Sequence, residues 1–151
     1  MSYRLKMILP VVGMFLLGCA VVAAVGEDSE IKQPLPPSLD DLAAVKLIEI
    51  RDAGGQVVLA GSFTMTTKPN RNVDGEATLA PAGVDQDAAG KAEVEVSTKK
   101  DGSVEKELEV EVRNLAPGAS FDVFVDGQRA ASFTTNPRGS AELEMSNEPA
   151  S

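Results

Sequence analysis

Residues 103–146 read SVEKELEVEVRNLAPGASFDVFVDGQRAASFTTNPRGSAELEMS, and this stretch decides the fold. Its first part alternates glutamates with aliphatic residues, namely Glu105, Glu107, Glu109 and Glu111 with Leu108, Val110 and Val112. Successive side chains of a β-strand point to opposite faces of a sheet, so the pattern predicts a strand with one acidic and one apolar face. Turn signals at 114–118, 126–127 and 136–139 divide the stretch into four strands.

The part of the chain before this stretch continues the pattern of short strands. The sequence predicts them at Leu42–Asp52, Gln56–Thr67, Glu76–Ala80 and Lys91–Thr98. About eight short strands at hairpin spacing predict an all-β fold, an antiparallel β-sandwich of the immunoglobulin-like or a related type. We place this domain at residues 42–147, followed by a polar tail at 148–151.

The turn before the opening stretch determines which glutamates face each other. A two-residue loop would bring apolar side chains and glutamates onto one face, which the pleat forbids. A three-residue loop at 100–102 avoids this, and it sets Glu93 opposite Glu109 and Glu95 opposite Glu107. A second register would also keep acidic and apolar side chains on separate faces of the sheet, and it too places two pairs of glutamates opposite each other. We therefore predict a like-charged interaction face formed by Glu93, Glu95, Glu107, Glu109 and Glu111.

The same requirement, that apolar side chains of paired strands share one face, applies to the turn at Asp126 and Gly127. It favours a three-residue loop, because that loop sets Phe121 opposite Phe133.

Aromatic residues make up only 4% of the chain and Trp is absent, so the core is expected to consist mostly of Val, Leu and Ala.

Residues 1–26 carry the features of an export signal. Arg4 and Lys6 precede a segment, 7–26, that contains no charged residue. Three interpretations stay open: a cleaved signal peptide, a lipoprotein signal whose sequence LLGC resembles a lipobox ending at an acylated Cys19, and an uncleaved membrane anchor. Each predicts a hydrophobic targeting helix and places the rest of the chain outside the cytoplasm, anchored at the cell envelope or secreted to the periplasm. Residues 27–41 are expected to form a Pro-rich linker.

Composition excludes several classes of function. The chain has no His and a single Cys, which removes the commonest general base, an intramolecular disulfide and a Cys/His zinc site. Residues 27–151 hold twelve basic and 23 acidic residues, a net formal charge of −11. Such a domain repels nucleic acid, so the expected partners are a basic protein and the membrane that the N-terminal segment or its lipid would contact. We predict no enzyme activity and no cofactor.

No metal site is predicted. The segment nearest to one is 70–76, which resembles the start of a calcium loop because oxygen-bearing residues stand at alternate positions. These residues are Asn70, Asn72, Asp74 and Glu76. The twelfth position of such a loop, where a bidentate Glu belongs, is Pro81, so a polar loop between strands is the preferred interpretation. For the glutamate face, the preferred interpretation is likewise a solvated surface that keeps the domain soluble.

Within 108–143, the sequence VEVRNLAPGASFDVFVDGQRAASFTTNPRGSAEL resembles a repeat-like β module of uncharacterised exported bacterial proteins. In that module a strand end of the form VEVEN-L-P-G precedes V-x-V-(D/N)-G and a T-T-x-x-x-G-x-x-x-L hairpin. The matching residues are Val110, Val112, Asn114, Pro117, Gly118, Val123, Val125, Asp126, Gly127, Thr134, Thr135, Gly139 and Leu143. The resemblance covers about a quarter of the chain, consists mostly of turn residues, implies a β-sandwich in a bacterial envelope setting, and assigns no catalytic residue.

These observations together predict a non-catalytic exported bacterial envelope protein that acts as a structural or protein-interaction module. The alternative is a domain that binds a cation or a small ligand with its acidic face. A calcium titration distinguishes these two hypotheses, because calcium would raise the melting temperature of a cation-binding domain.

Overall fold

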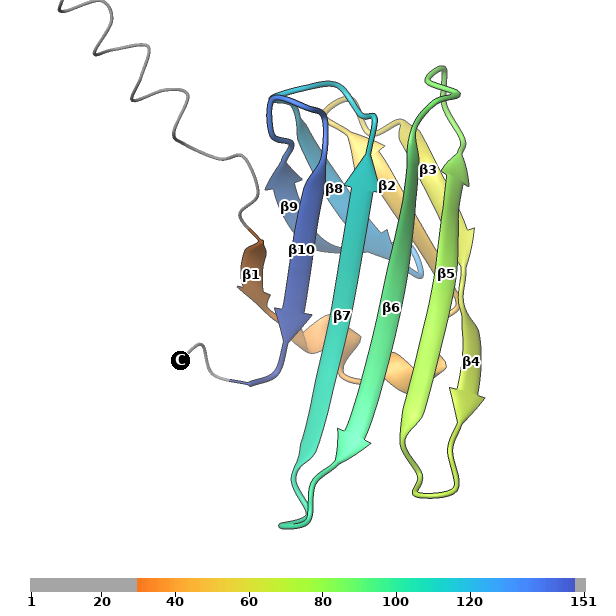
Figure 1. The fold of residues 1–151 in the computed structure, drawn as a ribbon, viewed down its shortest axis with the longest axis vertical. Coiled ribbons are helices and arrows are strands. Elements are labelled where there is room, and N and C mark those ends of the chain that lie inside the picture. The colour runs from red at the N-terminus through yellow and green to blue at the C-terminus, as the bar shows by residue number, and fades with distance from the viewer. Residues whose placement is uncertain (1–29, 149–151) are drawn as a thin grey trace, which may run out of the picture.

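The computed structural model describes residues 30–148 of the chain. Ten strands and two short 3-10 helices follow one another in this part (Figure 1). The strands are β1 (Ile31–Pro34), β2 (Leu47–Asp52), β3 (Val57–Ser62), β4 (Thr64–Thr67), β5 (Val73–Pro81), β6 (Ala89–Thr98), β7 (Val104–Arg113), β8 (Ser120–Val125), β9 (Gln128–Thr134) and β10 (Ala141–Ser146). The 3-10 helices η1 (Pro37–Leu39) and η2 (Leu42–Ala44) lie between β1 and β2.

The strands form one curled, nearly closed sheet that resembles a barrel. Their order is β1-β10-β7-β6-β5-β3-β2-β8-β9, and β4 pairs with β5 beside this path. Every strand pair within residues 30–148 is antiparallel except β1 with β10. The first and last strands of this order, β1 and β9, are joined by a side-chain hydrogen bond. Nε2 of Gln33 on β1 donates it to the carbonyl oxygen of Ser132 on β9 at 2.8 Å. The all-β prediction is thus confirmed, whereas two separate sheets of a sandwich are not.

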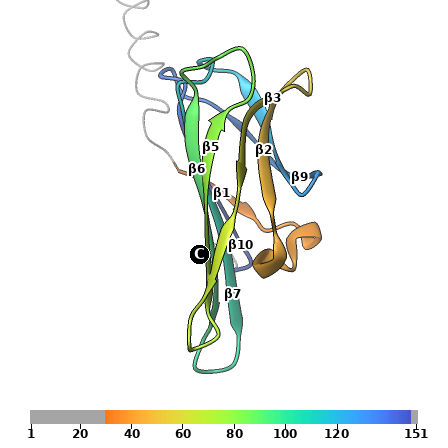
Figure 2. The same ribbon diagram turned by 90° about the vertical axis from the view of Figure 1, so that its right-hand side faces the viewer.

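The layers are unequal in length. Figure 2 shows the lower ends of β4, β5, β6 and β7 extending beyond the layer that contains β2, β3 and β9. The 3-10 helix η2 packs beneath β5, β6 and β7 and covers part of the inner face there. One face of β5, β6 and β7 therefore lines the core, and the opposite face is turned outward over its whole length.

The core consists of the inward side chains that the alternation predicts. Its largest fully buried members are Leu42, Ile48, Ile50, Leu59, Leu79, Leu108, Leu143, Met145, Val110, Val123 and Val125. Burying an aliphatic side chain of this size contributes roughly 1.5–3 kcal/mol relative to leaving it in water. The rings of Phe121 and Phe133 stack with centroids 5.8 Å apart and planes inclined by 25°. Stability thus rests on many medium-sized aliphatic residues and one aromatic pair.

The β6–β7 hairpin has the predicted register. Glu93 pairs with Glu109, and Glu95 pairs with Glu107. Gly102 has a φ of 86°, the left-handed conformation that the three-residue loop needs and that glycine adopts without steric cost. The predicted pairs of like charges are therefore confirmed.

The β8–β9 hairpin confirms one half of its prediction. Phe121 pairs with Phe133, as expected, but the turn has only two residues, Asp126 and Gly127. Both have positive φ, 48° and 81°, a geometry whose twist matches that of the flanking strands. The register shifts further along the hairpin, so that Ala130 is the extra residue of a bulge on β9. The prediction of a three-residue loop was therefore wrong. The extra residue that brings Phe121 opposite Phe133 lies in the bulge on β9 and not in the turn.

The segment before β2 belongs to the domain, although the sequence indicates a linker up to residue 41. β1 pairs with β10, and Leu39 of η1 is only 4% exposed. Nζ of Lys106 lies 2.7 Å from Oδ1 of Asp40, and this hydrogen-bonded charge holds the pKa of Asp40 below its ordinary value. The hydrophobic targeting helix predicted for residues 1–26, including Cys19, lies outside the described residues.

Two further strand boundaries differ from the predictions. The strand predicted for 56–67 is divided at Phe63, so that β3 pairs with β2 and β4 pairs with β5. β5 begins at Val73, three residues before the strand predicted at Glu76–Ala80. Within residues 30–148, no helix has the length and apolar character needed to cross a membrane.

Candidate functional site: an acidic sheet face

The outer face of β5, β6, β7 and β10 carries ten carboxylates. They stand at alternate positions, because the residues between them point to the inner face of the sheet. We define the acidic face as Asp74, Glu76, Glu93, Glu95, Glu105, Glu107, Glu109, Glu111, Glu142 and Glu144. The face is therefore a direct product of strand alternation repeated in four neighbouring strands.

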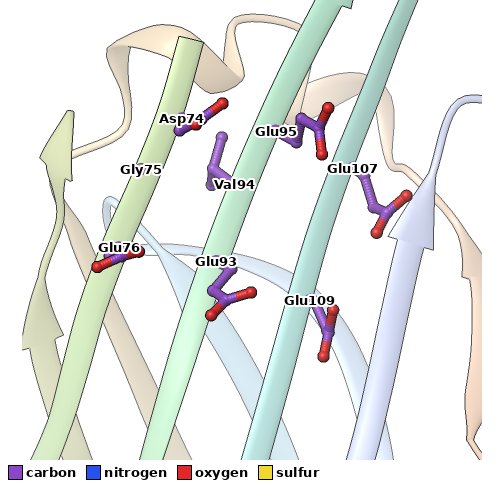
Figure 3. A pocket seen from close by; sticks show the side chains of 8 residues that line it. All are labelled: Asp74, Gly75, Glu76, Glu93, Val94, Glu95, Glu107 and Glu109. Carbon is purple, nitrogen blue, oxygen red and sulfur yellow. The ribbon is translucent and has the colours of Figure 1, made fainter. Parts of the chain in front are cut away.

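Strand pairing arranges these carboxylates in rows (Figure 3). One row crosses four strands through Glu76, Glu93, Glu109 and Glu144. A second row crosses three strands through Asp74, Glu95 and Glu107. Directly opposite residues of an antiparallel pair have Cβ atoms about 4.5–5.5 Å apart. Glu93, Glu95 and Glu109, inside the rows, therefore have like charges on both sides. An open recess of about 200 Å³ lies between the two rows.

Within residues 30–148, lysines form ion pairs with half of the carboxylates of the acidic face and leave the other half without one. The ion pairs are Lys32 with Glu144, Lys68 with Asp74, Lys91 with Glu93 and Glu111, and Lys99 with Glu105. Among residues 30–148, five carboxylates of the face have no ion pair, namely Glu76, Glu95, Glu107, Glu109 and Glu142. Glu95, Glu107 and Glu109 lie on the two central strands (Figure 3).

Two of the central carboxyl groups have raised pKa values. Partial burial raises the pKa of Glu107 above its ordinary value, and the negative charges of Glu144 and Glu95 raise it further. Partial burial also raises the pKa of Glu109, with the charge of Glu93 as the next cause. Both shifts mean that the ionised form is disfavoured in the folded protein. A positive charge that approached this face would relieve that penalty.

Three carboxylates of the face lie close enough together to share one cation. Each of Glu109, Glu111 and Glu142 offers an oxygen atom, and these oxygens lie within 4.8 Å of one another. Nζ of Lys91 is 3.4 Å from Oε1 of Glu111, and the charge of Glu111 is the main cause of the raised pKa of Lys91. A divalent cation at this position would therefore compete with a lysine that is already present.

The structure brings the residues of the predicted interaction face together. Glu93 and Glu95 lie on β6, and Glu107, Glu109 and Glu111 lie on β7, all on one face. The face is wider than the two strands predicted, because β5 and β10 flank this hairpin. Glu142 and Glu144 of β10 lie opposite Glu111 and Glu109, and nothing in the sequence indicated that β10 would lie beside β7.

The four residues considered for a calcium loop are divided between two environments. Asp74 and Glu76 belong to β5 and to the acidic face. Asn70 and Asn72 remain in the turn, where Oδ1 of Asn70 accepts a hydrogen bond from the N–H of Asn72 at 3.2 Å. Oδ1 of Asn72 accepts another from the N–H of Thr98 at 3.1 Å. The amide oxygens of this turn thus stabilise the backbone of the hairpin ends.

Comparisons with protein families, with curated proteins and with solved structures found no match to the chain. The resemblance of the 108–143 segment to exported bacterial β modules therefore stays a prediction.

Proposed function

We propose that this protein is a non-catalytic interaction module that binds a basic protein partner on its acidic face. The observation that carries the proposal is the set of central carboxylates, Glu95, Glu107 and Glu109, which have like charges beside them and form no ion pair among residues 30–148. An arrangement that destabilises the free protein becomes favourable once a cationic surface covers it. The carboxylates extend across four strands, β5, β6, β7 and β10, a width suited to contact with another macromolecule.

Electrostatics supports a partner of this kind over a neutral one. The 27–151 region carries a net formal charge of −11, so a basic partner would be steered toward it and nucleic acid would be repelled. A non-catalytic role is supported by the absence of His from the chain, which leaves serine and threonine hydroxyls without the usual base.

We propose further that the domain works outside the cytoplasm, in the bacterial envelope or beyond it. The support is the basic and then uncharged sequence of residues 1–26, followed by acidic residues from Glu27 onward. Mass spectrometry of the mature N-terminus tests this. A diacylglycerol on Cys19 would indicate a lipoprotein, a start near Glu27 a cleaved signal peptide, and a retained Met1 an anchor. A cytoplasmic chain with an unmodified Met1 would contradict export.

Binding of labelled octalysine to the full chain, measured by fluorescence anisotropy, tests the acidic face. The affinity should fall as NaCl rises from about 50 to about 500 mM, because added salt screens the charges. The double variant Glu95→Gln/Glu107→Gln should weaken binding by about tenfold, which is about 1.4 kcal/mol.

The matched control removes the same charge elsewhere. Asp85 and Asp87 lie exposed in the loop between β5 and β6, outside the acidic face. Asp85→Asn/Asp87→Asn should leave the affinity within about twofold, since these carboxylates lie outside the proposed contact. Equal losses in the two double variants would mean that net charge alone attracts octalysine, and the proposal would then fail.

A second candidate function is binding of a divalent cation, and the cluster of Glu109, Glu111 and Glu142 favours it. Carboxylate oxygens are the ligands that calcium prefers. Titration of the metal-free chain with calcium should then raise the melting temperature, and Glu142→Gln should abolish the rise. An unchanged melting temperature at millimolar calcium would rule this candidate out.

A further inference from the structure

β4 forms an open edge of the sheet. Its four residues, Thr64–Thr67, pair with β5 on one side, and no strand within residues 30–148 pairs with the other side. In Figure 1 the strand lies at the lower right border, beyond β5. Its backbone can therefore be reached from solvent along one whole side.

The direction of the backbone groups follows from the hairpin that joins β4 to β5. The N–H of Lys68 donates a hydrogen bond of 2.8 Å to the carbonyl oxygen of Asn72, so these residues form a hydrogen-bonded pair. Such pairs recur at every second residue of an antiparallel ladder, which directs the backbone groups of Thr66 toward β5. The N–H and C=O of Met65 and Thr67 consequently point away from the sheet and are available to another strand.

The other two edges are protected. β1 contains Lys32 and Pro34, and both residue types discourage pairing with a further strand. On β9, the carbonyl oxygen of Ser132 already accepts the hydrogen bond from Gln33, and Arg129 adds a charge. β4, with the sequence TMTT, has no charge, no Pro and no bulge, although natural proteins usually cover or charge such an edge.

We propose that β4 accepts an extended segment of the partner as an additional strand, and that this segment alternates basic with apolar side chains. The proposal rests on the proposed function, because it takes the acidic face as one half of the binding surface. Backbone hydrogen bonds to Met65 and Thr67 would supply affinity, and alternate side chains would supply specificity, as in other complexes formed by strand addition.

The two faces of β4 specify the alternation. On the outer side, Thr66 pairs with Asp74 and Thr64 pairs with Glu76, so the rows of carboxylates end at two short, uncharged side chains. An added strand would lie about 4.8 Å beyond β4, within reach of long cationic side chains that extend over the threonines. Lys68, at the end of β4, already reaches Asp74 in this way, and their hydrogen bond raises the pKa of Lys68.

The inner side of the edge is apolar. Met65 packs against the core and lies over Gly75 of β5, where a Cβ atom would collide with its sulfur. Phe63, just before β4, is also partly buried against the core. Side chains of an added strand that point to this side would contact Met65 and extend the apolar layer, so they are expected to be aliphatic.

A second copy of this chain fits the edge less well than a basic segment does. Two copies joined through β4 would continue one sheet, and their acidic faces would lie side by side. Each copy carries a net formal charge of −11 over residues 27–151, and like charges brought together oppose association. Charge complementarity therefore selects a partner strand with lysine or arginine on its outer side.

The test uses the full chain and a labelled peptide of about ten residues, the upper end of common strand lengths, in which lysine and valine alternate. Thr67→Pro removes an N–H that points away from β5, so the β4–β5 pairing is retained while the outer edge is blocked. The affinity for the peptide should fall at least about tenfold in this variant. Thr67→Val keeps the N–H and is the matched control, and it should bind like the unaltered chain.

A second probe removes any dependence on the folding of Thr67→Pro. The same peptide, methylated on alternate backbone nitrogens, keeps its charges but cannot pair along that edge, and it should bind the unaltered chain at least about tenfold more weakly. If neither backbone block weakens binding while Glu95→Gln/Glu107→Gln does, strand addition is overturned and the proposed function stands. If neither octalysine nor the alternating peptide binds, both are overturned.

Discussion

Replacing Glu109 by Gln is expected to stabilise the domain. Glu109 pairs directly with Glu93 on β6 and with Glu144 on β10, and Lys32 neutralises part of the second charge. Like charges directly opposite each other destabilise a sheet by up to about 1 kcal/mol, and solvent screening keeps an exposed pair near the lower end. The free energy of unfolding should rise by about 0.5 kcal/mol for Glu109→Gln and by about 1 kcal/mol for Glu109→Lys, which turns repulsion into attraction.

Urea unfolding at pH 7 and low salt measures this difference. For a dependence on urea of about 1–3 kcal/mol per M, a gain of 0.5 kcal/mol moves the midpoint by about 0.2–0.5 M. The gain should shrink in about 1 M NaCl, where charges are screened beyond about 3 Å. Glu111→Gln is the matched control on the same strand and face. Glu111 lies 3.4 Å from Lys91, so its replacement should not stabilise. Equal midpoints for Glu109→Gln and the unaltered chain, or equal gains in both variants, would refute the reasoning.

Three further changes should have defined effects. Gly139→Ala should lower the free energy of unfolding by more than about 2 kcal/mol, because φ of Gly139 is 76° and a Cβ atom would overlap the carbonyl oxygen of Leu115. Thermal denaturation measures this loss, and an unchanged melting temperature would contradict it. Gln33→Ala removes the hydrogen bond to Ser132 that joins the two ends of the sheet and should cost about 1 kcal/mol, with faster hydrogen exchange in β1; unaltered exchange would mean that other contacts hold the ends together. The pKa of Glu107 is raised in the folded protein, so its ionisation destabilises the domain at pH 7 and this effect fades as the pH falls to 4.5, its ordinary value, and below. The stability gained by Glu107→Gln should therefore shrink over that interval, and a gain that does not change with pH would contradict the shift.

The parts of the fold that could be predicted from the sequence are those in which neighbours in the chain are neighbours in space. The register of the β6–β7 hairpin follows from parity alone, because any odd slip would exchange the acidic and apolar faces. Parity also predicts that Phe121 lies opposite Phe133. It cannot distinguish a three-residue loop from a two-residue turn with a bulge, since both restore the same alternation.

The parts that escaped prediction depend on long-range pairing. β1 is four residues long and ends at Pro34, so its sequence has the composition of a linker, and only its pairing with β10 identifies it as a strand. Half of the acidic face could be predicted, because Glu93, Glu95, Glu107, Glu109 and Glu111 belong to one hairpin. The contributions of β5 and β10 could not, because the alternation in a strand specifies which face it buries but not which strand lies beside it.

The parallel pairing of β1 with β10 has a mechanical consequence. In Figure 1 β1 and β10 run in the same direction, so the first residue of β1 and the last residue of β10 lie at opposite ends of this strand pair. A pulling force between residues before β1 and residues after β10 would act along the strands and load the hydrogen bonds of this pair together, in shear. Strands pulled apart from one end would instead lose these bonds one at a time. Separating β1 from β10 in this direction therefore requires the hydrogen bonds of all four paired positions to break together.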